Sequence, residues 1–474
     1  MKNHFKILQE VRDMKKLSVV FVALTMVFTF SVAAIAAQAL FYSEKERLSV
    51  PPTKELEVYG SVRVGTYWVT ADKETNAASV TGFQYQGVGT NFDDSDLIWT
   101  LDDGATRFGV RFKSGKVGGN VEIRPRDRQT AGSFNDRNSI MRHWYGTYDI
   151  DNVGTLIVGQ TWTPTYHPIC NECLLGGGGF LDGFGDMGGS TRRAGLQLHM
   201  PINAVNGLLK LAALEPGWRA SGSNPNNSFG GGAEGPAYAG LPTAFTTPPG
   251  GYLGQGNLSP VLQNANAAPS TWNNVDATIP MLEASLSAAF GPTSWVVRGA
   301  YGSFDAKDTA TDSTQSIDTW MGAIDGSYGI GPFYVRASFY YGQNLAALGT
   351  QAPSSTNNFG FLPALYQNPT TRAVAVEDVD NYGWFGVAGY KFNDMVSVEA
   401  GYGQRIAKLN NPLNGFEDKD KHNAFVIFVP ISITPAFVIT PEILFADFDE
   451  LKVDGQTVDR GKQQYYGIYW RIDL

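Results

Sequence analysis

The residues with the most evident chemistry lie in one short segment, HPICNEC, which contains His167, Cys170 and Cys173. Together with Glu172, they offer a small set of ligands for a soft metal ion. A haem attachment sequence needs histidine directly after the second cysteine, and that position is Leu174. The chain has 2 cysteines in all. Their spacing favours a local disulfide after export over free thiols and over a metal site, so we predict no metal.

The histidines do not indicate catalysis. A hydrolase needs a nucleophile placed beside a histidine and an acid, and the histidines of this chain lie in no recognisable nucleophile motif. They are His4, His143, His167, His199 and His422. We therefore predict that the protein is not an enzyme and uses no cofactor. The formal net charge of −9 is spread along the chain and argues against nucleic acid as a partner.

Many charged residues instead alternate with apolar ones, which is the side-chain period of a β-strand. Residues 107–113 read RFGVRFK, and residues 117–124 read VGGNVEIR after a turn at Ser114-Gly115. The final segment, 462–474, reads KQQYYGIYWRIDL and places its large apolar side chains on one face. This pattern predicts strands with one polar and one apolar face, as in a barrel that has lipid outside and water inside.

The same alternation recurs along the chain and predicts about sixteen strands, an even number. They are 56–69, 107–113, 117–124, 140–150, 155–161, 191–200, 206–215, 275–290, 294–304, 317–329, 333–344, 381–392, 395–406, 422–434, 437–449 and 462–474. Residues 97–101 are expected to extend the second strand. We predict an all-β fold, a transmembrane antiparallel β-barrel of about sixteen strands.

The connections between these strands alternate in length. Short ones are expected at 114–115, 151–154, 291–293, 331–332, 393–394 and 434–436. Long ones are expected at 70–96, 125–139, 162–190, 216–274, 346–380 and 407–421. Short periplasmic turns and long outer loops are typical of outer-membrane barrels. Loop 216–274 is poor in charge and rich in small residues, so it is a variable surface loop or a cover for the pore mouth or a neighbouring subunit.

The amino-terminal region has the features of an export signal. Met14 and two lysines precede an apolar run from Leu17 to Ile35, and small residues follow it. We predict a cleaved signal peptide at 1–39, with Met14 as a possible true start, over a retained membrane anchor. Residues 40–55 are then a periplasmic linker, and 56–474 form the barrel.

The polar face of the expected strands carries many charges. A charged side chain at the lipid midplane costs roughly 2–4 kcal/mol for Arg or Lys, so these residues are expected to face a water-filled lumen. The basic ones are Arg63, Arg107, Arg111, Arg124, Arg193, Lys210, Arg298, Arg336 and Arg405. The acidic ones are Glu57, Glu122, Glu283, Asp325, Glu399 and Glu442. A mean hydropathy of −0.17 fits a barrel that is wet inside.

Several segments resemble the general porins of Gram-negative outer membranes, which are trimeric sixteen-stranded barrels. These are YGSVRVG at 59–65, RFGVRF at 107–112 and RHWYGTYDIDNVGTLIVGQ at 142–160, followed by a glycine-rich third loop at 162–190. The resemblance implies that this loop folds into the barrel and sets acidic residues against basic wall residues. The implied acids are Glu172, Asp182 and Asp186, which would otherwise be solvated loop charges. The implied basic wall is Arg63, Arg107, Arg111, Arg124, Arg142 and Arg193.

The expected function is therefore an outer-membrane pore for passive diffusion of small hydrophilic solutes and ions. A substrate-specific channel, for example for anions, is the alternative, because many wall residues are arginine. A structural or adhesive barrel is a third reading. The expected surroundings are outer-membrane lipid and lipopolysaccharide, and the resemblance implies a homotrimer.

Overall fold

The structure is a computed structural model of the whole chain. Its description covers residues 54–71, 96–101, 106–124, 141–171, 192–215, 252–253, 274–276, 279–308, 313–345, 364–367, 374–409, 419–447, 449–453, 456–459 and 462–474. No helix within these ranges is long and apolar enough to cross a membrane. The expected signal peptide at 1–39 and most of the linker at 40–55 lie outside the described residues.

The described residues are almost entirely β-strand. The strands are β1 (Lys54–Ala71), β2 (Asp96–Leu101), β3 (Arg107–Ser114), β4 (Val117–Ile123), β5 (Met141–Ile150), β6 (Gly154–Trp162), β7 (Arg192–Ile202), β8 (Gly207–Leu214), β9 (Tyr252–Leu253), β10 (Asn274–Asp276), β11 (Met281–Phe290), β12 (Thr293–Asp308), β13 (Ser313–Ile330), β14 (Phe333–Gln343), β15 (Ala364–Gln367), β16 (Val374–Glu377), β17 (Val379–Lys391), β18 (Ser397–Leu409), β19 (Lys419–Phe428), β20 (Ile431–Thr434), β21 (Phe437–Asp447), β22 (Glu450–Val453), β23 (Gln456–Asp459) and β24 (Lys462–Asp473). A short 3₁₀ turn, η5 (Asn203–Val205), joins β7 to β8.

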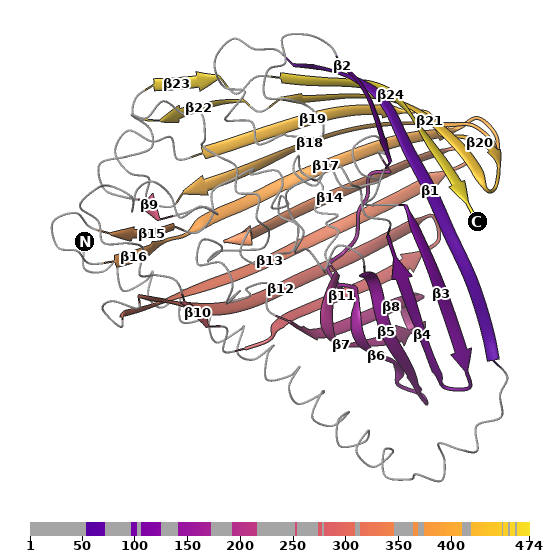
Figure 1. The fold of residues 1–474 in the computed structure, drawn as a ribbon, viewed down its shortest axis with the longest axis horizontal. Coiled ribbons are helices and arrows are strands. Elements are labelled where there is room, and N and C mark those ends of the chain that lie inside the picture. The colour runs from indigo at the N-terminus through magenta and orange to yellow at the C-terminus, as the bar shows by residue number, and fades with distance from the viewer. Residues whose placement is uncertain are drawn as a thin grey trace.

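The main sheet closes on itself into an antiparallel barrel (Figure 1). The seam is the pairing of β1 with β24, in which Ser61 lies opposite Asp473 and Ala71 opposite Gln463. In three places, two segments that follow each other in the chain pair with the same strand and together make one strand of the barrel. These are β2 and β3 on β1, β10 and β11 on β12, and β19 and β20 on β21. The barrel therefore has sixteen strands, as the sequence predicts, and residues 97–101 do extend the second one.

Side chains alternate between the two faces of the barrel wall. On β1, Val58 and Val62 are 58% and 42% exposed and face outward, whereas Ser61 between them is 1% exposed. On β13, Ile324 is 44% exposed and its neighbour Asp325 is 1% exposed. The outer surface is thus apolar and the ionisable side chains lie inside, as expected for a wall between lipid and a lumen.

Tight turns join the strands at one end. The Gly331-Pro332 turn between β13 and β14 has a glycine φ of 57°, and proline fixes its own φ near −65°. This order of a positive and then a negative φ belongs to type II′ hairpins, whose twist matches that of paired strands. Gly291-Pro292 repeats the arrangement, with a φ of 55°. The short turns predicted at 291–293 and 331–332 are confirmed.

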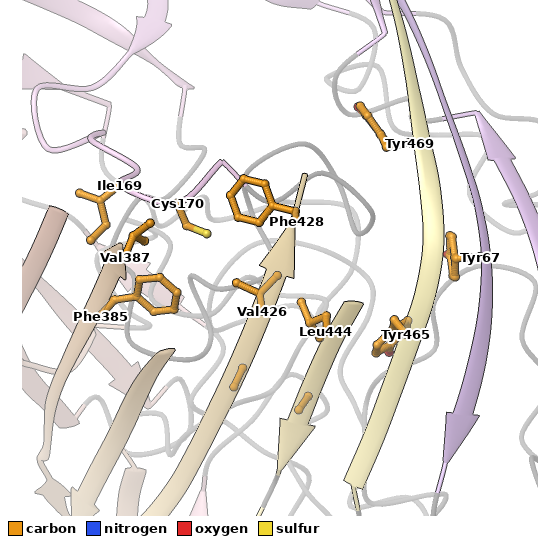
Figure 2. Close-up of a cluster of buried hydrophobic side chains, with 12 residues drawn as sticks. Tyr67, Ile169, Cys170, Phe385, Val387, Val426, Phe428, Leu444, Tyr465 and Tyr469 are labelled. Atoms are coloured by element: carbon orange, nitrogen blue, oxygen red, sulfur yellow. The ribbon is translucent and has the colours of Figure 1, made fainter. Parts of the chain in front are cut away.

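One part of the inner wall is apolar rather than wet, which differs from the uniformly polar lining that alternating charges predict. Phe385 and Val387 of β17, Val426 of β19, Leu444 of β21 and Tyr465 of β24 form one buried cluster, and each is at most 4% exposed. Figure 2 shows Ile169 and Cys170 of the third loop beside Val387, Phe385 and Phe428. We call this cluster the apolar stripe. The sequence does not predict the apolar stripe, because both faces of β17, β19 and β21 carry apolar side chains and alternation does not distinguish the inner face.

Candidate pore lining and constriction

The predicted basic wall begins on β1 and β3. Strand pairing sets Glu57 opposite Arg111 and Ser61 opposite Arg107, all on the inner face. Arg111 donates hydrogen bonds to both carboxylate oxygens of Glu57, at 3.1 and 3.3 Å. Arg63 donates from Nε to the hydroxyl of Ser61 at 3.0 Å. The inward orientation that alternation predicts for these arginines agrees with the structure.

A bulge between β4 and β5 concentrates charge at Glu122. The register shifts between Glu122 and Ile123, so that two successive residues of β5, Arg142 and His143, both approach the same carboxylate. Arg142 donates from Nε to Glu122 at 2.6 Å, and both side chains are 4% exposed. His143 Nε2 lies 3.7 Å from Glu122. Arg142 thus lies on the inner wall, and its role in a constriction stays a prediction.

Two further residues complete the contacts of Glu122. The hydroxyl of Tyr59 donates to Glu122 Oε2 at 2.9 Å. Arg107 Nε lies 3.8 Å from the same oxygen, and its side chain is 32% exposed. Arg124 lies within electrostatic range of Arg142. The carboxylate of Glu122 is therefore surrounded by donors from three strands.

An aromatic stack stands beside this group at the end of β6. The rings of Trp162 and Tyr166 are parallel, 3.9 Å apart and inclined by 5°. The guanidinium of Arg192 lies over Trp162 at 3.6 Å, which is a close cation–π contact. His143 meets the same indole edge-on at 5.6 Å. Trp162 and Tyr166 were missed in the sequence, where only the spacing of two aromatics around the end of a strand marks them. Arg192 was considered there as an alternative to Arg193.

The predicted residue Arg193 has a different position from Arg192. Its Nη1 donates to the backbone carbonyl of Glu215 at 3.0 Å, which ties it to the end of β8. The neighbouring Arg192, which alternation does not select, shares an indole with Arg142: their guanidinium carbons lie 3.6 and 6.0 Å from the centre of the Trp162 ring. The role of Arg193 in a constriction stays a prediction.

The first part of the third loop, residues 163–171, lies against the inner wall. Thr165 donates from its hydroxyl to Glu283 of β11 at 2.6 Å and from its backbone N–H to the same oxygen at 3.0 Å. Arg298 of β12 donates to the carbonyl of Thr165 at 2.6 Å and to Asp325 of β13 at 2.7 Å. Two adjacent strands, β11 and β12, therefore hold Thr165 directly, and Asp325 of β13 holds the arginine that does so.

Contacts continue along the loop. His167 Nδ1 lies 3.2 Å from Asp325 Oδ2. The side-chain amide of Asn171 lies beside the ion pair between Arg336 and Glu399. Between these two polar contacts, Ile169 is 3% exposed and packs in the apolar stripe. Burying such a side chain fully is worth about 1.5–3 kcal/mol, so the loop is held by apolar as well as polar contacts.

The rest of the predicted constriction lies outside the described residues. This applies to the loop acids Glu172, Asp182 and Asp186, and to Cys173. Cys170 is buried, at 3% exposure. The inward fold of the whole loop 162–190, its acidic edge and the disulfide between Cys170 and Cys173 stay predictions. The described residues contain no cluster of three or more His, Cys, Asp or Glu that could hold a metal ion.

The chain has solved structural relatives, although no family model and no curated protein matches it. The outer-membrane channel DcaP of Acinetobacter baumannii aligns over 89% of this chain and 97% of that one, with a TM-score of 0.56 and 16% identity. The anion-selective porin from Comamonas acidovorans aligns over 89% of this chain and 100% of that one, with a TM-score of 0.50 and 11% identity. This chain therefore has the barrel fold of outer-membrane channels.

Proposed function

We propose that this protein is an outer-membrane porin, a water-filled channel for passive diffusion of small hydrophilic solutes and ions. The observation that carries the proposal is the closed sixteen-stranded barrel whose ionisable side chains face inward. A barrel of this size is too wide for inward side chains to fill, so it leaves an aqueous path unless a plug enters it.

The contacts of residues 163–171 support a narrowed path. They bring chain from the end of β6 across to β11, β12, β13 and the β14–β18 ion pair, all on the inner face. A loop so placed reduces the open section of the lumen. We infer that it acts as the constriction, with the basic wall facing it, and that the pore has no catalytic role.

The remaining parts of the proposal follow from the sequence and, for the trimer, from the resemblance to general porins. The chain is exported by a cleaved signal peptide, lies in the outer membrane among lipid and lipopolysaccharide, and assembles as a homotrimer. The related structures support a location in the outer membrane.

Anion selectivity is the second candidate function, and one observation favours it. The acids Glu57, Glu122 and Asp325 are each engaged by an arginine, so their charges are largely offset in the wall. The excess of charge around Glu122 is positive. The structural relative from Comamonas acidovorans is an anion-selective porin.

Swelling of proteoliposomes tests the pore directly. Vesicles that contain the refolded protein should swell in isotonic solutions of small sugars, at rates that fall as the sugar becomes larger. Vesicles without protein are the control. A rate that equals the control for the smallest sugar would refute a diffusion pore.

A further inference from the structure

The third loop begins with a tight turn on the inner side of the barrel. The chain leaves β6 after Trp162, and the backbone N–H of Tyr166 donates to the carbonyl of Thr163 at 3.0 Å, which closes a β-turn over residues 163–166. The second residue of this turn is Pro164, and proline favours that position because its ring fixes φ at about −65°. The backbone of the turn is therefore stiff before any contact with the wall is considered.

The third residue of the turn is fastened to the wall. Thr165 donates from its hydroxyl and its backbone N–H to Glu283 of β11, and its carbonyl accepts from Arg298 of β12. Thr165, Glu283 and Arg298 are all buried. Contacts at a single residue fix the place of the loop better than its direction, because the chain can still rotate about that residue. A second attachment is needed to fix the direction.

Tyr166 provides this second attachment. Its ring lies parallel to that of Trp162, with 3.9 Å between the ring centres and an inclination of 5°. The guanidinium of Arg192 lies 3.6 Å from the centre of the same indole. Two groups at these distances cannot share one face of a ring, so Trp162 is held between Tyr166 and Arg192. Aromatic stacking and a cation–π contact thus act on opposite faces of one indole.

The indole is itself fixed by the wall. Trp162 is the last residue of β6 and lies opposite Arg192 of β7. Its carbonyl accepts from the side-chain amide of Gln197 at 3.0 Å, and Gln197 is buried. His143 of β5 meets the ring edge-on at 5.6 Å. Tyr166 is therefore held relative to β5, β6 and β7, whereas Thr165 is held relative to β11 and β12.

We propose that residues 162–166 form a rigid elbow in which Tyr166 is a positioning residue. Its stacking on Trp162 fixes the direction in which the third loop crosses the lumen, and thereby the width of the open path. The two attachments lie on either side of β8 in the sheet, so rotation about one of them is blocked by the other. The inference rests on the proposed pore function, because a width has a consequence only where solutes pass. It predicts one main conductance level for the open pore.

Single-channel conductance tests the elbow when the stacking is removed. Tyr166→Leu keeps an apolar side chain but has no flat ring, so it separates stacking from simple burial. The time spent in other conductance levels, relative to the main level, should rise about 2- to 12-fold, the ratio that corresponds to an aromatic pair beyond its area burial. Tyr166→Phe keeps the ring and should behave more like the unaltered protein than like Tyr166→Leu. Equal effects of Phe and Leu would refute stacking as the cause.

A matched variant separates the elbow from general weakening of the barrel. The rings of Tyr390 and Phe333 contact each other with 4.6 Å between their centres, and Phe333 is exposed on the outer face. Tyr390→Leu removes an aromatic contact far from the loop in the fold and should leave the conductance levels unchanged. Unchanged levels in Tyr166→Leu, or equal effects in Tyr166→Leu and Tyr390→Leu, would overturn the elbow.

Hydrogen exchange tests the elbow without requiring an open pore. Peptides that cover residues 163–171 include the N–H groups of Thr165 and Tyr166, which donate within the elbow and to the wall. Their exchange, measured by mass spectrometry on the refolded protein, should be about 2- to 12-fold faster in Tyr166→Leu and unchanged in Tyr390→Leu. Unchanged exchange in Tyr166→Leu would refute the elbow and leave the pore standing. Faster exchange in a protein that passes no current would refute the pore and leave the elbow.

Discussion

Replacing Arg298 by methionine should destabilise the barrel strongly. The guanidinium of Arg298 pairs with Asp325 at 2.7 Å and donates to the carbonyl of Thr165 at 2.6 Å. The side chains of this pair are 0% and 1% exposed, so Arg298→Met leaves a buried carboxylate that keeps the His167 imidazole at 3.2 Å but loses its guanidinium. Removing one partner of a buried ion pair costs about 3–5 kcal/mol, and we expect a loss of that size.

A double-mutant cycle isolates the pair itself. The free energies of unfolding of the unaltered protein, Arg298→Met, Asp325→Asn and the double variant are measured by urea titration in lipid vesicles, with tryptophan fluorescence as the readout. Once Arg298 is gone, neutralising Asp325 removes the uncompensated charge, so the double variant should be more stable than the sum of the single losses predicts. The expected interaction is about 1.5–3 kcal/mol, at the upper end for residues in contact.

The same variants report on the loop. Because Arg298 also holds the carbonyl of Thr165, Arg298→Met should loosen residues 163–171 and raise the noise of the open-channel current. A single-variant loss below about 1 kcal/mol, or additivity within about 0.5 kcal/mol, would refute the view that this buried pair fastens the third loop to the wall.

Two further predictions concern the two faces of the wall. A Cβ on Gly389 would lie 2.1 Å from the ring of Tyr334, whereas a Cβ on Gly386 of the same strand meets nothing within 4 Å. Gly389→Ala should therefore cost about 1–3 kcal/mol by overpacking and Gly386→Ala much less, as measured by urea titration; equal effects would contradict the packing. Ile324→Arg places a charge on the lipid side of β13 and should cost about 2–4 kcal/mol, whereas the exposed Thr314, near the outer end of β13, should accept arginine with a smaller loss; a tolerated Ile324→Arg would contradict the lipid-facing assignment.

The barrel and the direction of its side chains are well predicted from the sequence. The alternation of Arg111 with Phe112, or of Asp325 with Ile324, depends only on the two-residue period of a strand, and the structure confirms it. Cross-strand partners such as Glu57 and Arg111 come from the register of β1 against β3, which the periodicity of one strand does not give. Local periodicity is sufficient for side-chain direction because each strand separates the same two environments.

Features that depend on register shifts or on distant contacts could not be predicted. The bulge at Glu122 changes the parity of β5, so alternation alone does not bring both Arg142 and His143 to one carboxylate. Alternation selects Arg193 over Arg192 because a period of two picks only every second residue, whereas Arg192 makes its contact with Trp162 at the end of β7. A constriction residue is defined by what faces it across the lumen, and strand periodicity carries no information about that.

The contacts of the third loop could not be predicted from the sequence for a different reason. Thr165 carries no charge, and its role comes from Glu283, which lies 118 residues further along the chain. The apolar stripe was hidden because Phe385 and Val387 resemble ordinary lipid-facing residues until the strand pairing shows that they point inward. The loop is therefore fastened by residues that only the closed barrel brings together.

Single-channel conductance of the refolded mature protein in a planar bilayer, with a salt gradient across it, tests the central claim most directly. We predict large, stable open steps that close in thirds for a trimer, and a reversal potential whose sign shows preference for anions because of the positive excess around Glu122. A barrel that inserts but passes no current would contradict the water-filled pore. A reversal potential of the opposite sign would contradict the dominance of the basic wall.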